Sequence, residues 1–126
     1  MTPFGDKLRE LRDSRGIALK TMAHEIGVSP AYLSALEHGR RGKPPWYLVQ
    51  RVIGYFNVIW DEAEELENLA QISWPKVSID ASRLSASHIE LANRLRMTIA
   101  GLSEQQAETL TRMLCSLPVE DMNNAK

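Results

Sequence analysis

Apolar residues recur every three or four positions through the first 70 residues, in runs separated by glycine, proline or asparagine. This spacing predicts short amphipathic helices, because three to four residues make one helical turn. The expected helical faces are Phe4, Leu8 and Leu11, followed by Arg15; Leu33 and Leu36; Trp46, Val49, Val52, Ile53 and Phe56; and Ile59, Ala63, Leu66, Leu69 and Ala70. With helices over about 19–26 and 30–38, the pattern predicts an all-α domain of five helices over residues 1–72.

Residues 22–39 have the sequence of two helices joined by a tight turn. Ala23 is small enough for two helices to cross closely, and Gly27 supplies the left-handed position that ends the first helix. Ser29 is a good N-cap, and Pro30 falls at the first helical position, where its missing N–H costs nothing. A DNA-reading helix-turn-helix needs these features, because its second helix must stand out far enough to enter a major groove. The segment therefore predicts a DNA recognition element.

Helical periodicity is lost over residues 73–87. Val77 and Ile79 alternate with polar residues, which fits a short extended segment. The serines and the proline of this stretch fit a linker equally well. The sequence leaves both interpretations open.

Residues 88–118 have the pattern of two further helices that meet at Gly101. Capping boxes are expected over 87–90 and 103–106, where a serine precedes Glu or Gln by three positions. The apolar residues are Leu91, Leu95 and Ile99, then Ala107, Leu110, Leu114 and Leu117. Such short helices are marginal alone and must pack on each other, on the first domain or on a second copy. We expect the second helix to carry the dimer interface, or alternatively to cover its own first domain; residues 119–126 are expected to form a disordered tail.

The charge of the chain is unevenly distributed. The net charge is −1, but residues 1–57 hold nine Lys or Arg and five Asp or Glu, whereas residues 58–126 hold six and eleven. A basic first half and an acidic second half suggest that only the first faces phosphate. The alternative is a chance distribution with a solvated acidic helix.

Composition excludes several other classes of function. No apolar run approaches the roughly 20 residues of a membrane span, and the N-terminus lacks the apolar stretch of a signal peptide, so we expect a cytoplasmic protein without membrane contact. The one cysteine, Cys115, lies beside an apolar stripe and is expected to pack rather than react. His24, His38 and His88 lack the spacing of metal ligands. Without a phosphate-binding glycine loop or a nucleophile motif, we expect no catalysis, no metal and no cofactor.

Residues 4–58 resemble the Cro/cI-type helix-turn-helix domain of bacterial and phage regulators, the XRE family. The resemblance lies in Leu8-Arg9-Glu10-Leu11-Arg12 before Gly16, in Ala23, in Gly27-Val28-Ser29, in Tyr32-Leu33, in Leu36-Glu37-His38-Gly39, and in Arg40-Arg41 before Pro44-Pro45. It implies a five-helix domain, and it implies that Arg12 and Glu37 form a buried structural ion pair between the first and third helices. The extension from Trp60 to Leu117 is similar to those of some members, with no defined activity attached.

The resemblance also implies which residues contact DNA. The expected set is Lys20, Ser29, Pro30, Ala31, Tyr32, Ser34, Ala35, His38, Arg40, Arg41 and Lys43. Pro30, Ala31, Ser34 and Ala35 would face base edges, but only Ser34 and the adjacent Tyr32 carry hydrogen-bonding groups. Base readout is therefore expected from these two, aided by the arginines and by DNA shape. The loop cations and Lys20, at a helix N-terminus, are expected on phosphates, with His38 a further candidate.

The sequence thus predicts a sequence-specific transcriptional regulator, in its simplest form a repressor. A single module offers few base contacts, so we expect a homodimer on double-stranded DNA with an inverted-repeat operator. The alternative is a protein-binding module such as an antitoxin, whose C-terminal helices bind a partner protein.

Overall fold

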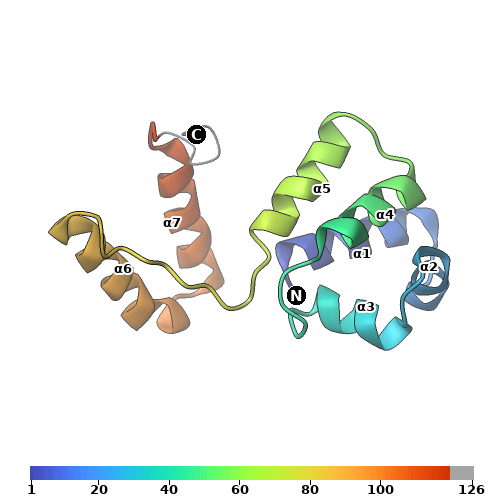
Figure 1. Ribbon diagram of the computed structural model, residues 1–126, viewed down its shortest axis with the longest axis horizontal. Helices are drawn as coiled ribbons and strands as arrows, with labels where there is room; N and C mark the ends of the chain where they lie inside the picture. The colour runs from blue at the N-terminus through green and yellow to red at the C-terminus, as the bar shows by residue number, and fades with distance from the viewer. Residues whose placement is uncertain (120–126) are drawn as a thin grey trace. The chain divides into compact units, whose positions relative to one another are not determined.

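The computed structural model describes residues 1–119, and every regular element in that part of the chain is a helix (Figure 1). The elements are α1 (Pro3–Arg15), α2 (Leu19–Ile26), α3 (Pro30–Glu37), α4 (Trp46–Phe56), α5 (Asp61–Gln71), α6 (Ala86–Thr98), the 3-10 helix η1 (Ile99–Gly101) and α7 (Glu104–Ser116). The expected all-α class, five helices followed by a C-terminal pair, is confirmed. The predicted disordered tail lies, apart from Val119, outside the described residues. No described helix is long and apolar enough to cross a membrane.

Local signals set the ends of the first three helices. The Thr2 hydroxyl accepts a 3.0 Å hydrogen bond from the Gly5 N–H at the start of α1, and Gly16 ends that helix with φ +64°. Gly27 ends α2 with φ +80°, as expected. At the start of α3, the Ser29 hydroxyl accepts a 3.0 Å bond from the Tyr32 N–H. These caps satisfy backbone groups that helix termini leave unpaired.

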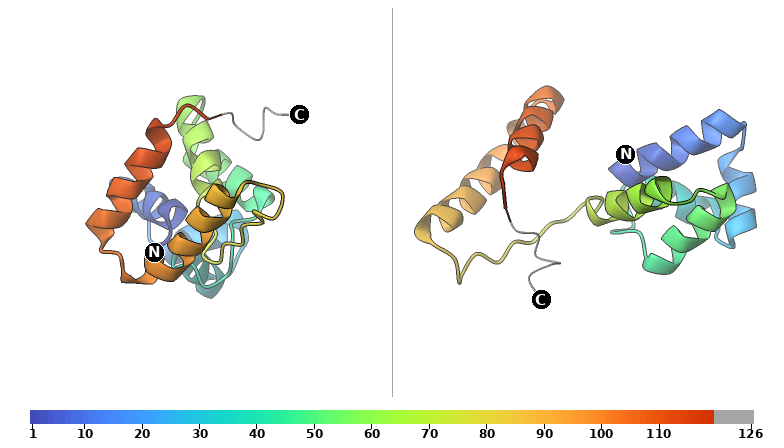
Figure 2. Two further views of the ribbon diagram at one scale, coloured as in Figure 1. Left: turned by 90° about the vertical axis from the view of Figure 1, so that its left-hand side faces the viewer. Right: turned by 90° about the horizontal axis from the view of Figure 1, so that it is seen from above.

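The helices α1–α5 enclose one apolar core (Figures 1 and 2). Its buried side chains are Phe4, Leu8, Leu11, Met22, Ala23, Ile26, Leu33, Leu36, Leu48, Val49, Val52, Phe56, Val58, Leu66 and Ala70. The buried side chains of α1, α2 and α3 pack against one another. This packing holds α2 and α3, the helix-turn-helix, in place.

Two predicted core residues are exposed instead. Trp46 is 65% exposed because α4 turns Leu48 and Val49 toward the core, and Trp46 lies off that face. Ile59 is 64% exposed because the turn before α5 places Val58 inward. Periodicity alone assigned both residues to the apolar face, and the first residue of a helix and a turn residue are where such assignments are weakest.

The segment after α5 does not begin as a linker. Ser73 is buried; its hydroxyl accepts a 2.9 Å bond from the Phe4 N–H and donates a 2.6 Å bond to the Leu69 carbonyl. The two compact units of the chain divide between Val77 and Ser78, so the first unit extends five residues beyond the expected end at residue 72. No strand forms over residues 73–87.

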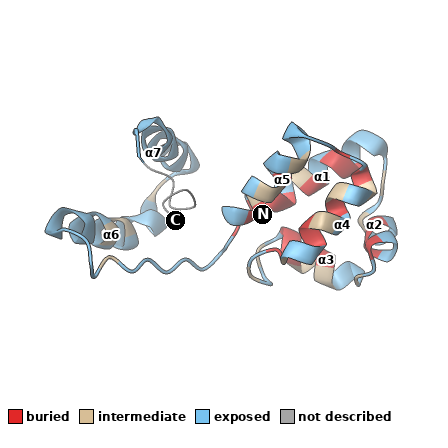
Figure 3. Cartoon of the chain, turned by 45° about the horizontal axis from the view of Figure 1, so that its top comes forward, coloured by how far each residue is buried: buried red, intermediate tan, exposed pale blue. Residues whose placement is uncertain are grey.

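The second unit has two capped helices and, over its described residues 78–119, no buried side chain. α6 begins at Ala86, and Ser85 is its N-cap, so the capping box predicted at Ser87 is wrong. The capping box predicted for α7, formed by Ser103 and Gln106, is confirmed. α6 and α7 diverge from η1 (Figures 1 and 2). None of their residues is buried (Figure 3). The expected faces of both helices are therefore uncovered within this unit.

Candidate nucleic-acid interface

The helix-turn-helix is held together at its turn. Ala23 is fully buried where α2 meets α3, and its carbonyl accepts a 2.9 Å bond from the Val28 N–H. Leu33 and Leu36 anchor α3 to the core. On the remaining surface of α3, Pro30 and Ala31 are exposed, and Tyr32, Ser34 and Ala35 are half-buried. By their spacing, Pro30, Ala31, Ser34 and Ala35 thus lie on one accessible side of the helix, with Tyr32 beside them.

A buried ion pair fixes α3 to α1. One guanidinium nitrogen of Arg12 lies 3.0 Å and 3.1 Å from the two carboxylate oxygens of Glu37, whose side chain is 1% exposed. Burial raises the pKa of Glu37, and the Arg12 charge opposes that shift. The pair that the family resemblance implied is present in the structure.

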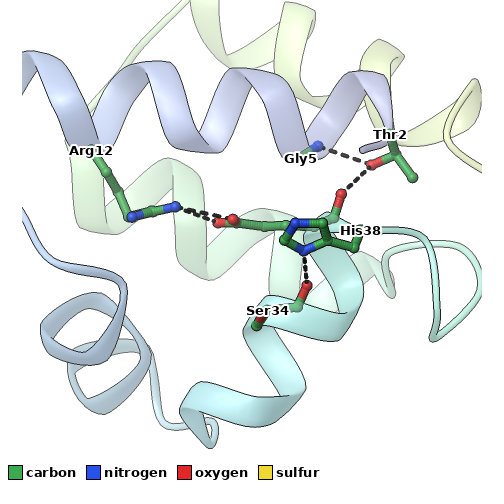
Figure 4. Close-up of polar contacts among 6 residues, drawn as sticks. Thr2, Gly5, Arg12, Ser34 and His38 are labelled. Carbon is green, nitrogen blue, oxygen red and sulfur yellow. Dashed lines mark hydrogen bonds and ion pairs between the residues drawn. The ribbon is translucent and has the colours of Figure 1, made fainter.

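The two helices also approach at their backbones. The Thr2 N–H donates a 3.0 Å bond to the Glu37 carbonyl oxygen. A Cβ at Gly5 would overlap that same carbonyl, so only glycine fits there. Figure 4 shows the contacts on Thr2, Gly5 and Arg12 around the C-terminal end of α3. The orientation of the recognition helix therefore depends on α1 at two points.

His38, the C-cap residue of α3, already makes one hydrogen bond with its ring. Its Nδ1 lies 2.8 Å from the Ser34 carbonyl oxygen and donates to it (Figure 4). In the neutral ring this bond leaves Nε2 as an acceptor, so a contact with a phosphate oxygen requires the ring to carry both protons. The side chain is exposed, as a phosphate contact requires.

Aromatic rings and arginines extend the surface beside α3. The Arg41 guanidinium carbon lies 5.0 Å from the ring centre of Tyr32, and that of Arg51 lies 5.1 Å from the ring centre of Tyr47. Arg51 also donates a 3.2 Å bond to the Ile26 carbonyl at the end of α2. Burial raises the pKa of the Tyr32 phenol, and the nearby Tyr47 adds to that shift.

Sequence reasoning missed Tyr47 and Arg51. Both lie outside the apolar stripe of α4, four positions apart, and therefore on one side of that helix. This spacing is the signal that marks them as a pair. It does not reveal which other helix they face, because that depends on how α4 packs.

The loop after α3 presents its cations to solvent. Arg40, Arg41 and Lys43 are exposed, with Gly39 and Gly42 at φ +79° and +83° shaping the loop. Within the described residues, none of these three cations forms an ion pair with a carboxylate. Their charge is available to an anionic partner.

Lys20 occupies a comparable position at the first turn of α2. The residue before that helix, Ala18, gives no side-chain cap, so the first backbone N–H groups of α2 lack a side-chain acceptor. Lys20 is exposed beside them. This combination suits a phosphate oxygen.

Comparison with known proteins supports the assignment of the first unit. A family model described as a helix-turn-helix domain matches residues 3–70, more than half of the chain. In Bacillus subtilis (strain 168), the chain is 34% identical over 61 residues to the uncharacterized HTH-type transcriptional regulator RghRB and 43% identical over 44 residues to the HTH-type transcriptional repressor RghR. These matches cover 48% and 35% of this chain and only 44% and 33% of the two relatives.

A longer match extends beyond the first unit. The chain is 28% identical over 84 residues to the HTH-type transcriptional regulator SinR of the same organism, a match that covers 62% of this chain and 76% of SinR. A solved SinR protein/SinI protein complex aligns over 88% of this chain and 93% of that one, with 21% identity and a TM-score of 0.43.

Proposed function

The chain belongs to the XRE family of helix-turn-helix transcriptional regulators, and we propose that it represses transcription by binding operator DNA as a homodimer. The observation that carries DNA binding is the accessible face of α3, flanked by cations of the following loop that form no ion pair with any described residue. A helix that enters the major groove needs such a face, and phosphates on either side need such cations. The chain is a regulator rather than an enzyme, and the proposal includes a cytoplasmic location, where DNA is accessible.

Base readout is assigned to Ser34 and Tyr32. Pro30, Ala31 and Ala35 offer no hydrogen-bonding side chain, and they contribute close approach or contact with a thymine methyl. Ser34→Ala and Tyr32→Ala should each weaken the best site by about 1–3 kcal/mol and change the preferred bases.

Selection of bound sequences from random double-stranded DNA tests this proposal. We expect enrichment of an inverted repeat whose half-sites lie about 10 base pairs apart, and steep loss of affinity with salt. Arg40→Ala should flatten the salt dependence by about one unit of slope and leave the selected sequence unchanged. A protein that enriches no sequence, or that binds DNA without salt dependence, contradicts the proposal.

The homodimer is supported by the second unit. Leu110 and Leu114 on α7 are 40% and 58% exposed, and Leu117, directly after that helix, is 55% exposed; no residue of α6 or α7 is buried. Helices of 13 residues without a buried face are unstable in water, so they require a partner surface. We assign that surface to a second copy, which also doubles the number of base contacts.

The same exposed face favours a second candidate function, a module that binds a different protein. In that function α7 would hold a partner chain, and DNA binding would be secondary, as in an antitoxin. Sedimentation of the purified chain separates the two. A stable monomer that pairs only with a second protein supports the alternative.

A further inference from the structure

We propose that the segment directly after α5 is part of the DNA interface, where Trp74 and Lys76 complete a phosphate-binding groove with the loop that follows α3. The groove runs between residues 39–43 and residues 74–76 of the first unit. This inference rests on the proposed function, because its ligand is a phosphodiester of the bound DNA.

Among the described residues, the lining of the groove includes three cations and no carboxylate. Arg40 and Lys43 come from the loop, and Lys76 comes from the segment after α5. In the part of the chain that the structure describes, none of them is paired with an acidic side chain. Cations that converge on a groove without a counter-charge attract an anion of two or more acceptor oxygens. A DNA phosphate, already next to the recognition helix, has that chemistry.

Trp74 acts as a positioning residue for Lys43. The ammonium nitrogen of Lys43 lies 4.5 Å from the centre of a Trp74 ring. An attraction of this kind limits the rotamers of a flexible lysine, while its three N–H donors keep access to solvent on the side away from the ring. Because the Lys43 side chain is already restricted in the free protein, it loses less conformational entropy when it contacts a phosphate.

The segment is fixed to the same unit as the recognition helix. Ser73 bonds to the Phe4 N–H and the Leu69 carbonyl, which places the next residues beside the loop. Pro75 packs near Gly39, since its Cβ is 3.6 Å from the position of a Cβ added there. Both walls of the groove thus have a fixed spacing, and Lys76 is carried on a structured part of the chain.

Lys76→Ala is the first test, with Arg83→Ala as its matched control. Both residues are exposed and each change removes one positive charge, but Arg83 lies beyond the first unit. Lys76→Ala should lower the slope of log affinity against log salt by about 0.9 and leave the selected sequence unchanged. Arg83→Ala should keep the parental slope. Equal slopes in the two variants overturn the inference.

Trp74 is tested by a double-mutant cycle with Lys43. Trp74→Leu should weaken DNA binding about 2–5-fold in the parent and have no effect in Lys43→Ala, because the ring acts through that lysine. Trp74→Phe, which keeps an aromatic face, should restore part of the loss. Additive effects, or equal losses in Leu and Phe variants with parental melting temperature, contradict the positioning role.

A third measurement separates DNA phosphate from free phosphate. In a Trp46→Phe/Trp60→Phe background, Trp74 is the remaining tryptophan, and both replaced side chains are largely exposed. We expect its fluorescence to change on addition of operator DNA and to stay constant when inorganic phosphate replaces chloride at fixed ionic strength. Saturable binding of inorganic phosphate alone overturns the assignment to DNA. If the parent protein fails to bind DNA, the proposed function fails; if the parent binds and Lys76→Ala matches Arg83→Ala, only the groove fails.

Discussion

Arg41 stacks on Tyr32: its guanidinium carbon lies 5.0 Å from the centre of the phenol ring. The contact joins the loop after α3 to the recognition helix itself. Arg41 therefore differs from its neighbour Arg40, which belongs to the groove with Lys43 and Lys76. The sequence predicted the same role for the two arginines, because they are adjacent and of one charge.

Arg41→Ala should change the preferred bases, because it releases the Tyr32 ring. Arg40→Ala should reduce affinity uniformly and leave the preference intact. A double-mutant cycle between Arg41 and Tyr32 should give a coupling of about 0.5–1 kcal/mol on the best site. Selection from random DNA and titration of each variant measure both effects. Identical selected sequences for Arg41→Ala and Arg40→Ala would show that the stack has no part in readout.

The buried ion pair predicts a pH-dependent loss of stability on removing its cation. Arg12→Met leaves the Glu37 carboxylate buried beside an apolar side chain, which should cost about 3 kcal/mol of unfolding free energy near neutral pH. Without the opposing Arg12 charge, the pKa of Glu37 rises further above its ordinary value. A carboxyl with a raised folded pKa contributes stability below its unfolded pKa and loses it as pH rises through the folded pKa.

The deficit of Arg12→Met relative to the parent should therefore be smaller at about pH 5 than at about pH 8, as measured by urea unfolding. Arg12→Met/Glu37→Gln should lose this pH dependence, because no buried carboxyl remains. Arg94→Met is the control for removing a paired arginine: its pair with Glu90 is 72% and 61% exposed, and the cost should stay below about 0.5 kcal/mol. A deficit that is constant with pH would exclude ionisation of Glu37 as its cause.

The close approach of α1 to α3 predicts opposite effects of alanine at two helical glycines. Gly5→Ala should destabilise the first unit, because its methyl group would meet the Glu37 carbonyl. Overpacking of this kind costs at least about 1 kcal/mol of unfolding free energy. Gly54→Ala, on the exposed side of α4 with open space at its Cβ, should stabilise by about 0.5–1 kcal/mol. Thermal unfolding of both variants measures the difference. A stable Gly5→Ala protein with unchanged DNA affinity would mean that α3 can shift without consequence.

Local chemistry explains why α2 and α3 were predicted to within a residue. Gly27, Ser29 and Pro30 each act on the backbone within a few positions, so their effect is visible in the sequence. The capping box at Ser87 was wrong because Ser85 caps the helix instead, and its hydroxyl also meets the His88 ring at 2.6 Å. Two serines near one helix start present alternatives between which the sequence does not decide.

Contacts between elements could not be predicted in this way. Trp74 contacts Lys43 only because its neighbour Ser73 bonds to the backbone of Phe4, at the start of α1. Ser73 and Phe4 are 69 positions apart in the sequence. Tyr47 reaches the recognition helix through the packing of α4. Neither contact leaves a periodic pattern. The site predicted from sequence thus contained Tyr32 but lacked Tyr47 and Trp74, the other two aromatic residues that contact its cations.

The exposed apolar residues of α7 predict that the dimer is lost when its face is charged. Leu110→Asp/Leu114→Asp should convert a dimer into a monomer that binds one half-site weakly, because two carboxylates cannot be buried in an apolar interface. Gln105→Asp/Thr109→Asp is the matched control, with the same added charge and the same four-residue spacing on another side of α7. Sedimentation at equal concentration measures the association of both.

The state of the first unit decides between the remaining interpretations of α7. If α7 serves self-association, the double aspartate variant should keep the parental melting temperature of the α1–α5 core while losing the dimer. If α7 instead covers its own first domain, the same charges should unfold that core and leave no folded monomer. A dimer equal to that of the parent would contradict the α7 interface, and some other surface would then have to join the two recognition helices that an inverted repeat requires.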